Sequence, residues 1–103
     1  MEKKYRLSYL KLAQSDLLEI VDYISNELAA PEAALTLIDK LDKSIINLEQ
    51  FPYSGHLYKN NRKFETAHRV LVVENYLVFY VVYDDVVEIR RILYGKRNYE
   101  PLI

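Results

Sequence analysis

Residues 76–83 read Tyr-Leu-Val-Phe-Tyr-Val-Val-Tyr, a run of β-branched and aromatic residues that is apolar on both alternating faces. The dipeptides Glu74-Asn75 and Asp84-Asp85 flank this run and suit tight hairpin turns. Segments 66–73 and 86–94 on either side are also rich in β-branched residues, with three valines in the first and two valines and two isoleucines in the second. The pattern predicts three consecutive strands, with 76–83 in the middle, covered by helices on one face and available to a partner on the other.

Two amphipathic helices are predicted upstream of these strands. Ser8 is a suitable N-cap for the first helix, whose polar face is expected to include Asp16. Pro31 fits the first turn of the second helix, and Phe51-Pro52 ends it. Only Ala29-Ala30 separates the helices, which predicts an antiparallel hairpin. The expected buried stripes are Leu12, Ala13, Leu17, Ile20, Ile24 and Leu28 in the first helix, and Ala34, Leu37, Ile38, Leu41, Ile45 and Leu48 in the second.

A short first strand at residues 4–7 and a polar, basic loop at 53–63 complete the pattern. The predicted order is β-α-α-β-β-β, an α+β fold with the helix hairpin on one face of a mostly antiparallel, twisted sheet. A chain of 103 residues fits one domain, so we expect residues 1–103 to form a single unit.

Composition excludes several classes of protein. The chain has no cysteine, so a disulfide framework and a thiol nucleophile are both excluded. No uncharged run approaches the roughly 20 residues of a membrane helix, and the N-terminus lacks the apolar core of a signal peptide. We therefore expect a cytoplasmic protein without a membrane partner. The charge is uneven, since residues 1–52 carry a net −3 and residues 53–103 a net +2.

The residues present indicate no cofactor and no metal. His56 and His68 match no spacing typical of metal ligands, and surface positions are expected for both. The two glycines lie forty positions apart, at Gly55 and Gly95, and cannot form a phosphate-binding loop.

One cluster of cationic residues could carry chemistry: Arg69 on the first strand of the meander, Arg91 on the third, and Lys96, Arg97 and Tyr99 after it. Such residues can cleave RNA without a metal, because a base deprotonates the ribose 2′-OH while arginines hold the charged phosphate. They could also dock an acidic protein, or be solvent-face residues of half-buried strands. An up-down-up meander places Arg69 and Arg97 at opposite ends, which opposes one compact pocket.

Several short segments, in order along nearly the whole chain, resemble the RelE/ParE superfamily of toxins from bacterial type II toxin–antitoxin systems. The resemblance rests on a set of weak matches rather than on one motif. They are Tyr5-Arg6-Leu7-Ser8, Ala13, Asp16-Leu17, Glu19-Ile20, Tyr23-Ile24, Ala33-Ala34, Phe51-Pro52 with Gly55, Val78-Phe79-Tyr80, Val87-Glu88-Ile89, Arg91-Ile92-Leu93-Tyr94-Gly95 and Arg97-Asn98-Tyr99.

The resemblance implies one of two activities. RelE-like toxins cleave mRNA on the ribosome and place an arginine after the tyrosine of the central strand, where this chain has Leu77. The start at Arg6-Leu7-Ser8 and the strand 87–93 look closer to ParE, whose members inhibit DNA gyrase without known nuclease chemistry. A degenerate, non-toxic member that only binds antitoxin is a third possibility. A RelE-like chain would use Arg69, Lys96, Arg97 and Tyr99 as catalytic residues, and a ParE-like chain would bind its target through Arg69, Arg91, Lys96 and Arg97.

The resemblance also implies a cognate antitoxin and a role in plasmid stabilisation. The central strand is apolar on both faces, so we expect a groove there for an amphipathic antitoxin segment. The predicted antitoxin contacts are Tyr76, Val78, Tyr80 and Val82.

Overall fold

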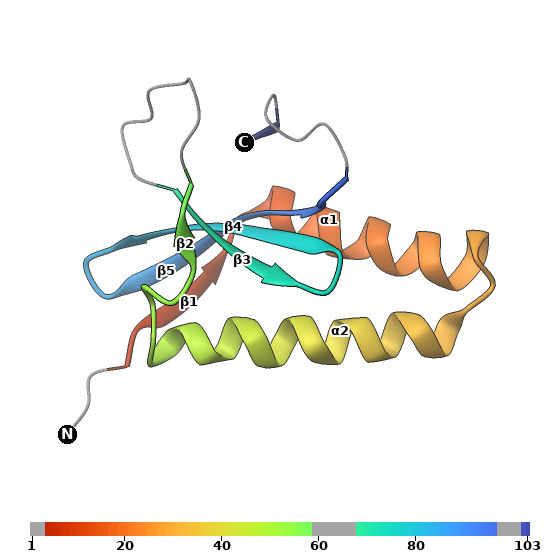
Figure 1. Ribbon diagram of the computed structural model, residues 1–103, viewed down its shortest axis with the longest axis horizontal. Coiled ribbons are helices and arrows are strands. Elements are labelled where there is room, and N and C mark those ends of the chain that lie inside the picture. Colours follow the sequence, from red (N-terminus) through yellow and green to blue (C-terminus); the bar gives the residue numbers. More distant parts are fainter. Residues whose placement is uncertain (1–3, 59–67, 97–101) are drawn as a thin grey trace.

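A computed structural model describes residues 4–58, 68–96 and 102–103. Two long helices lie side by side on one face of a sheet, so the chain has the predicted α+β fold (Figure 1). In chain order the elements are β1 (Arg6–Tyr9), α1 (Lys11–Asp22), the π-helical turn η1 (Tyr23–Glu27), α2 (Pro31–Ile46), the 3₁₀ turn η2 (Asn47–Glu49), β2 (His56–Leu57), β3 (Arg69–Val73), β4 (Tyr76–Tyr83) and β5 (Val86–Tyr94).

The five strands form one sheet in the order β1-β5-β4-β3-β2. The first strand pairs in parallel with β5, and every other neighbouring pair is antiparallel. The bounds of β4 and β5 agree with the prediction, and β4 lies at the centre of the sheet. A bulge at Phe79/Tyr80 leaves Arg90 of β5 without an opposite residue on β4.

The helices bury one stripe each against the sheet. All six predicted positions of α2 and η2 pack in or against the core, and Pro31 lies in the first turn of α2 as predicted. In the first helix Ala13 and Ile24 are buried, but the side chains of Leu12 and Leu28 are 57% and 55% exposed. The prediction was wrong for these two leucines. Leu12 is rotated by about 100° from Ala13 and so leaves the buried stripe, and Leu28 follows the last helical turn.

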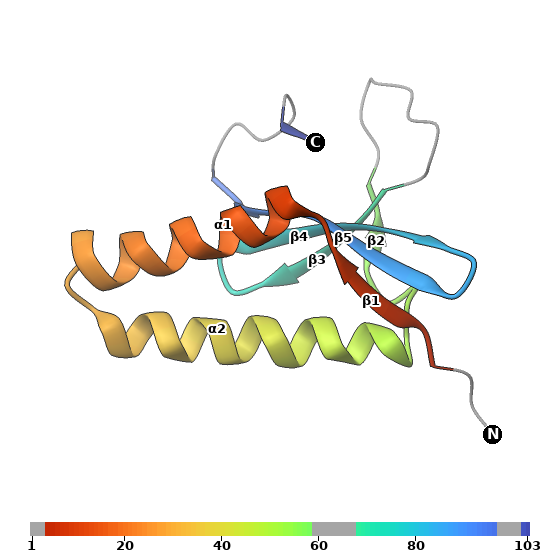
Figure 2. The ribbon, with the colours of Figure 1, turned by 180° about the vertical axis from the view of Figure 1, so that it is seen from behind.

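The start of α1 also differs from the prediction. Ser8 does not cap the helix, because it belongs to β1 and pairs with Glu88 of β5. The strand therefore runs two residues further than expected and leads almost directly into α1, as Figure 2 shows. Leu10 occupies the N-cap position without a side-chain hydrogen bond, and its backbone N–H donates to the carbonyl oxygen of Ile89 at 3.0 Å. Pairing with a distant strand outweighs the local capping preference of serine.

A second strand inside the predicted loop, β2, pairs with β3 through His56 opposite Val70. His56 is exposed as predicted, but the prediction of a surface position was wrong for His68, which is 6% exposed because it lies where the chain after β2 pairs with the start of β3. Tyr58 follows β2 and packs edge-on against Phe79, with ring centroids 5.3 Å apart. Phe79 and Val81 lie on the face of β4 that is turned away from the helices, and their side chains are 0% and 2% exposed. At these two positions the face that we expected to be available to a partner is covered by the chain itself.

Candidate functional site: a tyrosine-lined groove and its polar support

A groove of about 630 Å³ lies at the end of the helix hairpin. Its walls come from α1, η1 and the start of α2 on one side, and from the start of β4 and the end of β5 on the other. Most of the lining is apolar or aromatic, with two carboxylates at the α1 side. The lining residues are Asp16, Glu19, Ile20, Tyr23, Ile24, Leu28, Ala30, Ala33, Asn75, Tyr76, Ile92, Leu93 and Tyr94.

The π-helical turn η1 shapes the helical wall of this groove. The backbone N–H of Leu28 donates to the carbonyl oxygen of Tyr23 at 3.1 Å, one residue further than in an α-helix. Ala29 then takes a left-handed conformation with φ of 50°, and the N–H of Ala30 donates to the carbonyl oxygen of Ile24 at 3.0 Å. The wide turn leaves Tyr23 and Leu28 more than half exposed at the groove.

Three tyrosines contribute aromatic surface to the groove. The rings of Tyr76 and Tyr94 lie opposite each other on β4 and β5, with centroids 5.6 Å apart and planes inclined by 60°. Burial raises the pKa of the Tyr76 hydroxyl above its ordinary value, and the neighbouring Tyr94 and Tyr23 raise it further. The hydroxyl of Tyr76 is therefore close enough to those of Tyr94 and Tyr23 to interact with them.

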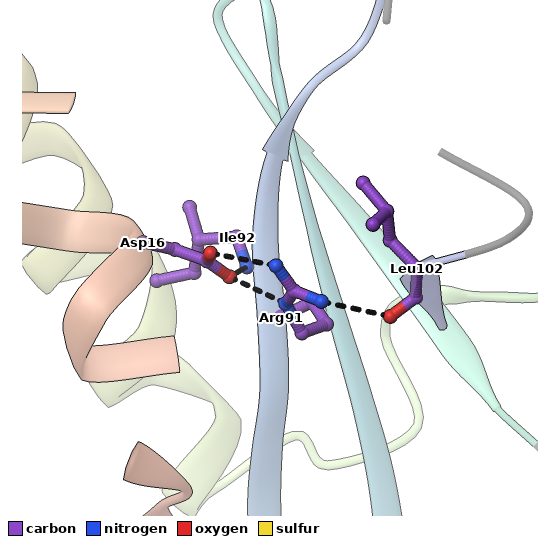
Figure 3. A network of polar contacts seen from close by, with 4 residues as sticks. All are labelled: Asp16, Arg91, Ile92 and Leu102. Atoms are coloured by element: carbon purple, nitrogen blue, oxygen red, sulfur yellow. Dashed lines mark hydrogen bonds and ion pairs between the residues drawn. The ribbon is translucent and has the colours of Figure 1, made fainter. Parts of the chain in front are cut away.

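The floor of the groove at β5 is held by Asp16 (Figure 3). Its carboxylate accepts two hydrogen bonds from the guanidinium of Arg91, at 2.8 and 2.9 Å, and one from the backbone N–H of Ile92 at 2.9 Å. Arg91 also donates to the carbonyl oxygen of Leu102 at 2.8 Å, on the side away from α1. The hydrogen bond to Asp16 raises the pKa of Arg91 further above its ordinary value, with a smaller contribution from Glu19.

This network explains why an acidic residue is buried in α1. The parallel pairing of β1 with β5 ends at Tyr9 opposite Ile89, so among the described residues no strand lies beside the edge of β5 beyond that point. Asp16 takes the place of a strand there and accepts the N–H of Ile92. The prediction of a solvent-facing Asp16 was therefore wrong, since its side chain is only 6% exposed.

A second polar support holds the segment before β2 against the sheet. The buried hydroxyl of Tyr80 donates to the carbonyl oxygen of Pro52 at 2.8 Å and accepts the backbone N–H of Gly55 at 2.9 Å. A Cβ atom at Gly55 would lie 2.6 Å from this hydroxyl and 2.8 Å from the carbonyl oxygen of Val70, so only glycine fits. Tyr80 thus fixes the segment from Pro52 to Gly55 against β4 from within the core.

Arg69 is engaged in the same support. Its guanidinium donates to the carbonyl oxygen of Gly55 at 3.0 Å and to that of Tyr53 at 3.4 Å. The guanidinium carbon also lies 4.9 Å from the centroid of the Tyr53 ring, a cation–π contact. These contacts direct Arg69 toward the 53–55 segment.

The structure does not gather the described members of the predicted catalytic set. Arg69 pairs with Tyr80 across the sheet, whereas Lys96 follows Tyr94, which pairs with Tyr76. Four residues of β4 separate the two levels, or about 13 Å along the strand. Arg97 and Tyr99 lie outside the described residues.

The residues predicted to bind a target or an antitoxin are only partly accessible. Val78 and Tyr80 are 0% exposed and lie in the core beneath the helices. The alternation of β4 turns the whole predicted set toward the helices, and only Tyr76, at the groove, and Val82 keep partial exposure. Lys96 is exposed, whereas the Arg91 side chain is 14% exposed and bound to Asp16.

The sequence does not predict the groove, because its apolar residues fit the periodic pattern of the helix core or belong to the ends of strands. The exposed Tyr23 and Leu28, two large apolar residues flanking the helix connection, were the available signal. Among the described residues, no cluster of His, Cys, Asp or Glu could hold a metal ion. None of the helices in the described part of the chain is long and apolar enough to cross a membrane.

The helix hairpin packed on this five-stranded sheet is a two-layer α+β fold of the RelE/ParE-like class. The family model described as "ParE toxin of type II toxin-antitoxin system, parDE" matches residues 7–99, and the chain belongs to this family. A solved structure described as a chromosomal ParDE toxin–antitoxin system from P. aeruginosa is similar, with a TM-score of 0.74 and 22% identity over 91% of this chain and 99% of that chain. A search of curated proteins finds no match.

Proposed function

We propose that this ParE-family toxin stops growth by binding DNA gyrase, that a cognate antitoxin neutralises it, and that the pair acts in plasmid stabilisation. We favour gyrase over mRNA as the target because Arg69 and Arg91 are both hydrogen-bonded to other parts of the fold. Arg69 binds backbone carbonyls of the 53–55 segment and Arg91 binds Asp16. A phosphate-cleaving site needs cations directed at one reacting group, and these two are directed elsewhere.

The proposed target surface is the C-terminal end of β5, where Lys96 is exposed. Arg97 follows it in the sequence and belongs to the same proposal. Arg91 holds this end of the strand in place through Leu102, so we assign it a supporting role rather than a target contact.

The direct test is a supercoiling assay with purified gyrase, run beside an mRNA-cleavage assay on programmed ribosomes. We expect inhibition of supercoiling and intact mRNA. Replacing Lys96 with Glu should weaken the inhibition by about tenfold, because a charge reversal at an interface opposes association. Lys11→Glu, on the exposed face of α1, is the matched control and should inhibit like the unchanged chain.

Two results would redirect the proposal. Cleaved mRNA beside unaffected gyrase would favour the RelE-like endoribonuclease, with Lys96, Arg97 and Tyr99 as the residues to substitute next. Induced expression that leaves growth untouched would favour the non-toxic member that retains only antitoxin binding.

A further inference from the structure

The groove at the hairpin end lies outside the target surface proposed at Lys96 and has a different chemistry. Its lining includes two carboxylates and three tyrosine rings, and no Lys, Arg or His is among the lining residues. Large apolar side chains stay exposed there, at 53% for Tyr23, 55% for Leu28 and 40% for Tyr94. Exposed apolar side chains around a hollow are typical of a protein interface.

The two carboxylates have different roles. Asp16 is saturated by Arg91 and by the N–H of Ile92. Glu19 lies one turn further along α1 on the same wall and is exposed. It is close enough to Arg91 to raise the pKa of that guanidinium, but no hydrogen bond joins them among the interactions described above. Glu19 is therefore the carboxylate that can meet a cation entering the groove.

A guanidinium or ammonium group on an aliphatic stem is the ligand that matches this surface. Its charge would pair with Glu19 and lie against the tyrosine faces, while the stem would contact Ile20 and Leu28. The volume of about 630 Å³ holds a few side chains rather than a whole partner helix.

We propose that the groove docks a segment of the antitoxin that presents a Lys or Arg side chain beside an aliphatic one. This inference rests on the proposed antitoxin partnership and adds the chemistry of the segment recognised. The groove is distinct from the predicted contacts Val78 and Tyr80, which lie in the core.

The chemistry can be tested with two short probes, acetyl-Leu-Arg-Leu-amide and the same peptide with neutral citrulline in place of arginine. Each is titrated into the toxin while the ring signals of Tyr23, Tyr76 and Tyr94 are followed by NMR. We expect the arginine peptide to shift these signals and to bind about fivefold more tightly than the citrulline peptide. Equal binding, or shifts confined to tyrosines outside the groove, would overturn the proposal.

Matched variants separate the groove from the rest of the surface. Glu19→Gln and Tyr94→Leu should each weaken binding of the arginine peptide severalfold. Glu49→Gln and Tyr83→Leu remove the same groups away from the groove, and should bind like the unchanged chain. Amide spectra that match the unchanged chain establish that each variant is folded.

A final arm distinguishes this inference from the proposed function. The toxin is co-expressed with the product of the adjacent reading frame, and the affinity of the complex is measured for the unchanged chain and for the Glu19→Gln/Tyr94→Leu double variant. A complex weakened by at least tenfold supports the proposal. A complex of unchanged affinity overturns the groove assignment but leaves the antitoxin partnership intact, whereas no complex with the unchanged chain overturns both. Concentration-dependent self-association that the double variant abolishes would assign the groove to a second copy and also overturn the proposal.

Discussion

At the scale of single residues, the carboxylate of Asp16 joins the first helix to the last strand. It accepts three hydrogen bonds, two from a guanidinium and one from a backbone N–H at the uncovered edge of β5. In the described part of the chain no strand lies beside Ile92, because β1 has already ended, and the other acceptor described for Arg91 is the carbonyl oxygen of Leu102. Removing the charge of Asp16 therefore leaves a largely buried Arg91 without its counter-ion.

We expect Asp16→Asn to lower the free energy of unfolding by about 2–3 kcal/mol, near the lower limit for breaking a buried pair, because Arg91 keeps some contact with water. The amide preserves shape and can still accept one hydrogen bond, so the loss reports on charge. Chemical denaturation measures it. Asp22→Asn, on the exposed face of the same helix, is the control and should change the free energy by less than about 0.5 kcal/mol. A loss of similar size in both variants would refute the role of the pair.

The buried hydroxyl of Tyr80 is a second group on which we expect the stability of the chain to depend, because it bonds both Pro52 and Gly55. Tyr80→Phe leaves the carbonyl oxygen of Pro52 and the N–H of Gly55 without their partner in a buried place. We expect a destabilisation of about 2 kcal/mol. Tyr83→Phe removes a hydroxyl from the 45% exposed tyrosine at the end of the same strand, and its effect should be near zero. Thermal unfolding of both variants shows whether the loss of stability comes from the two buried hydrogen bonds of Tyr80 or from removing any tyrosine hydroxyl.

The same hydroxyl predicts a dependence on alkaline pH. Burial raises the pKa of Tyr80 above its ordinary value of 10.0, although the Gly55 N–H and Arg69 lower it in part. The unfolded chain then loses this proton first, so stability falls as the pH rises above 10. The stabilisation is complete below the unfolded pKa and is lost as the pH passes the folded one.

We therefore expect the stability difference between the unchanged chain and Tyr80→Phe to be smaller at about pH 11 than at about pH 8. Denaturant midpoints at the two pH values give this comparison, and a Tyr80→Phe difference that grows with pH would contradict the sign.

At the scale of elements, the connection between η1 and α2 carries local strain. Ala29 has φ of 50°, a left-handed conformation that costs a residue with a Cβ about 1–2 kcal/mol. Glycine is the residue that usually ends a helix in this conformation. The strain lies beside the proposed antitoxin groove, where the connection sets the position of Leu28.

We expect Ala29→Gly to stabilise the chain by about 0.5–1 kcal/mol, since the relief of strain exceeds the added entropy of the unfolded glycine. Ala33→Gly makes the same chemical change in the regular first turns of α2 and should destabilise it by a similar amount. Opposite signs in thermal unfolding would confirm the backbone origin of the effect, and equal signs would refute it.

The elements that sequence reasoning predicted well are those whose burial follows a local period. The stripe of α2 and the bounds of β4 and β5 belong to this group, because each repeats every 3.6 or 2 residues. Ser8 and Asp16 were misassigned because Glu88 and Arg91, more than seventy positions away, determine their environments. Local preferences favour a helix cap at Ser8 and a solvent-exposed position for Asp16. Their contacts with the edge of β5 override both preferences.

The candidate site was less predictable for the same reason. A groove formed by α1, η1 and the ends of two strands has no signature within any one segment. The cationic residues were identifiable as a group, but the partners that engage them were not. Backbone carbonyls of residues 53 and 55 hold Arg69, and backbone acceptors leave no trace in a sequence.

At the scale of the whole molecule, the two ends of the chain meet at one strand. The last strand, β5, has β1 and then α1 along one edge and β4 along the other. The N-terminal part thus closes the sheet formed by the C-terminal part. Among the described strands, the acidic helical half therefore has no separate sheet on which to fold. We expect the proposed target surface and the proposed antitoxin groove to lie on one cooperative unit.

We therefore expect a single unfolding transition in guanidinium, with far-UV circular dichroism for the helices and tyrosine fluorescence for the sheet giving the same midpoint. The fluorescence probe is available because the chain has ten tyrosines and no tryptophan. Tyr76, Tyr80, Tyr83 and Tyr94 on β4 and β5 place part of that signal in the sheet. In Asp16→Asn both midpoints should decrease together, because loosening α1 from β5 weakens the whole unit. Separate midpoints, with the helices lost before the sheet, would show that the hairpin unfolds on its own and that β5 does not join the two halves.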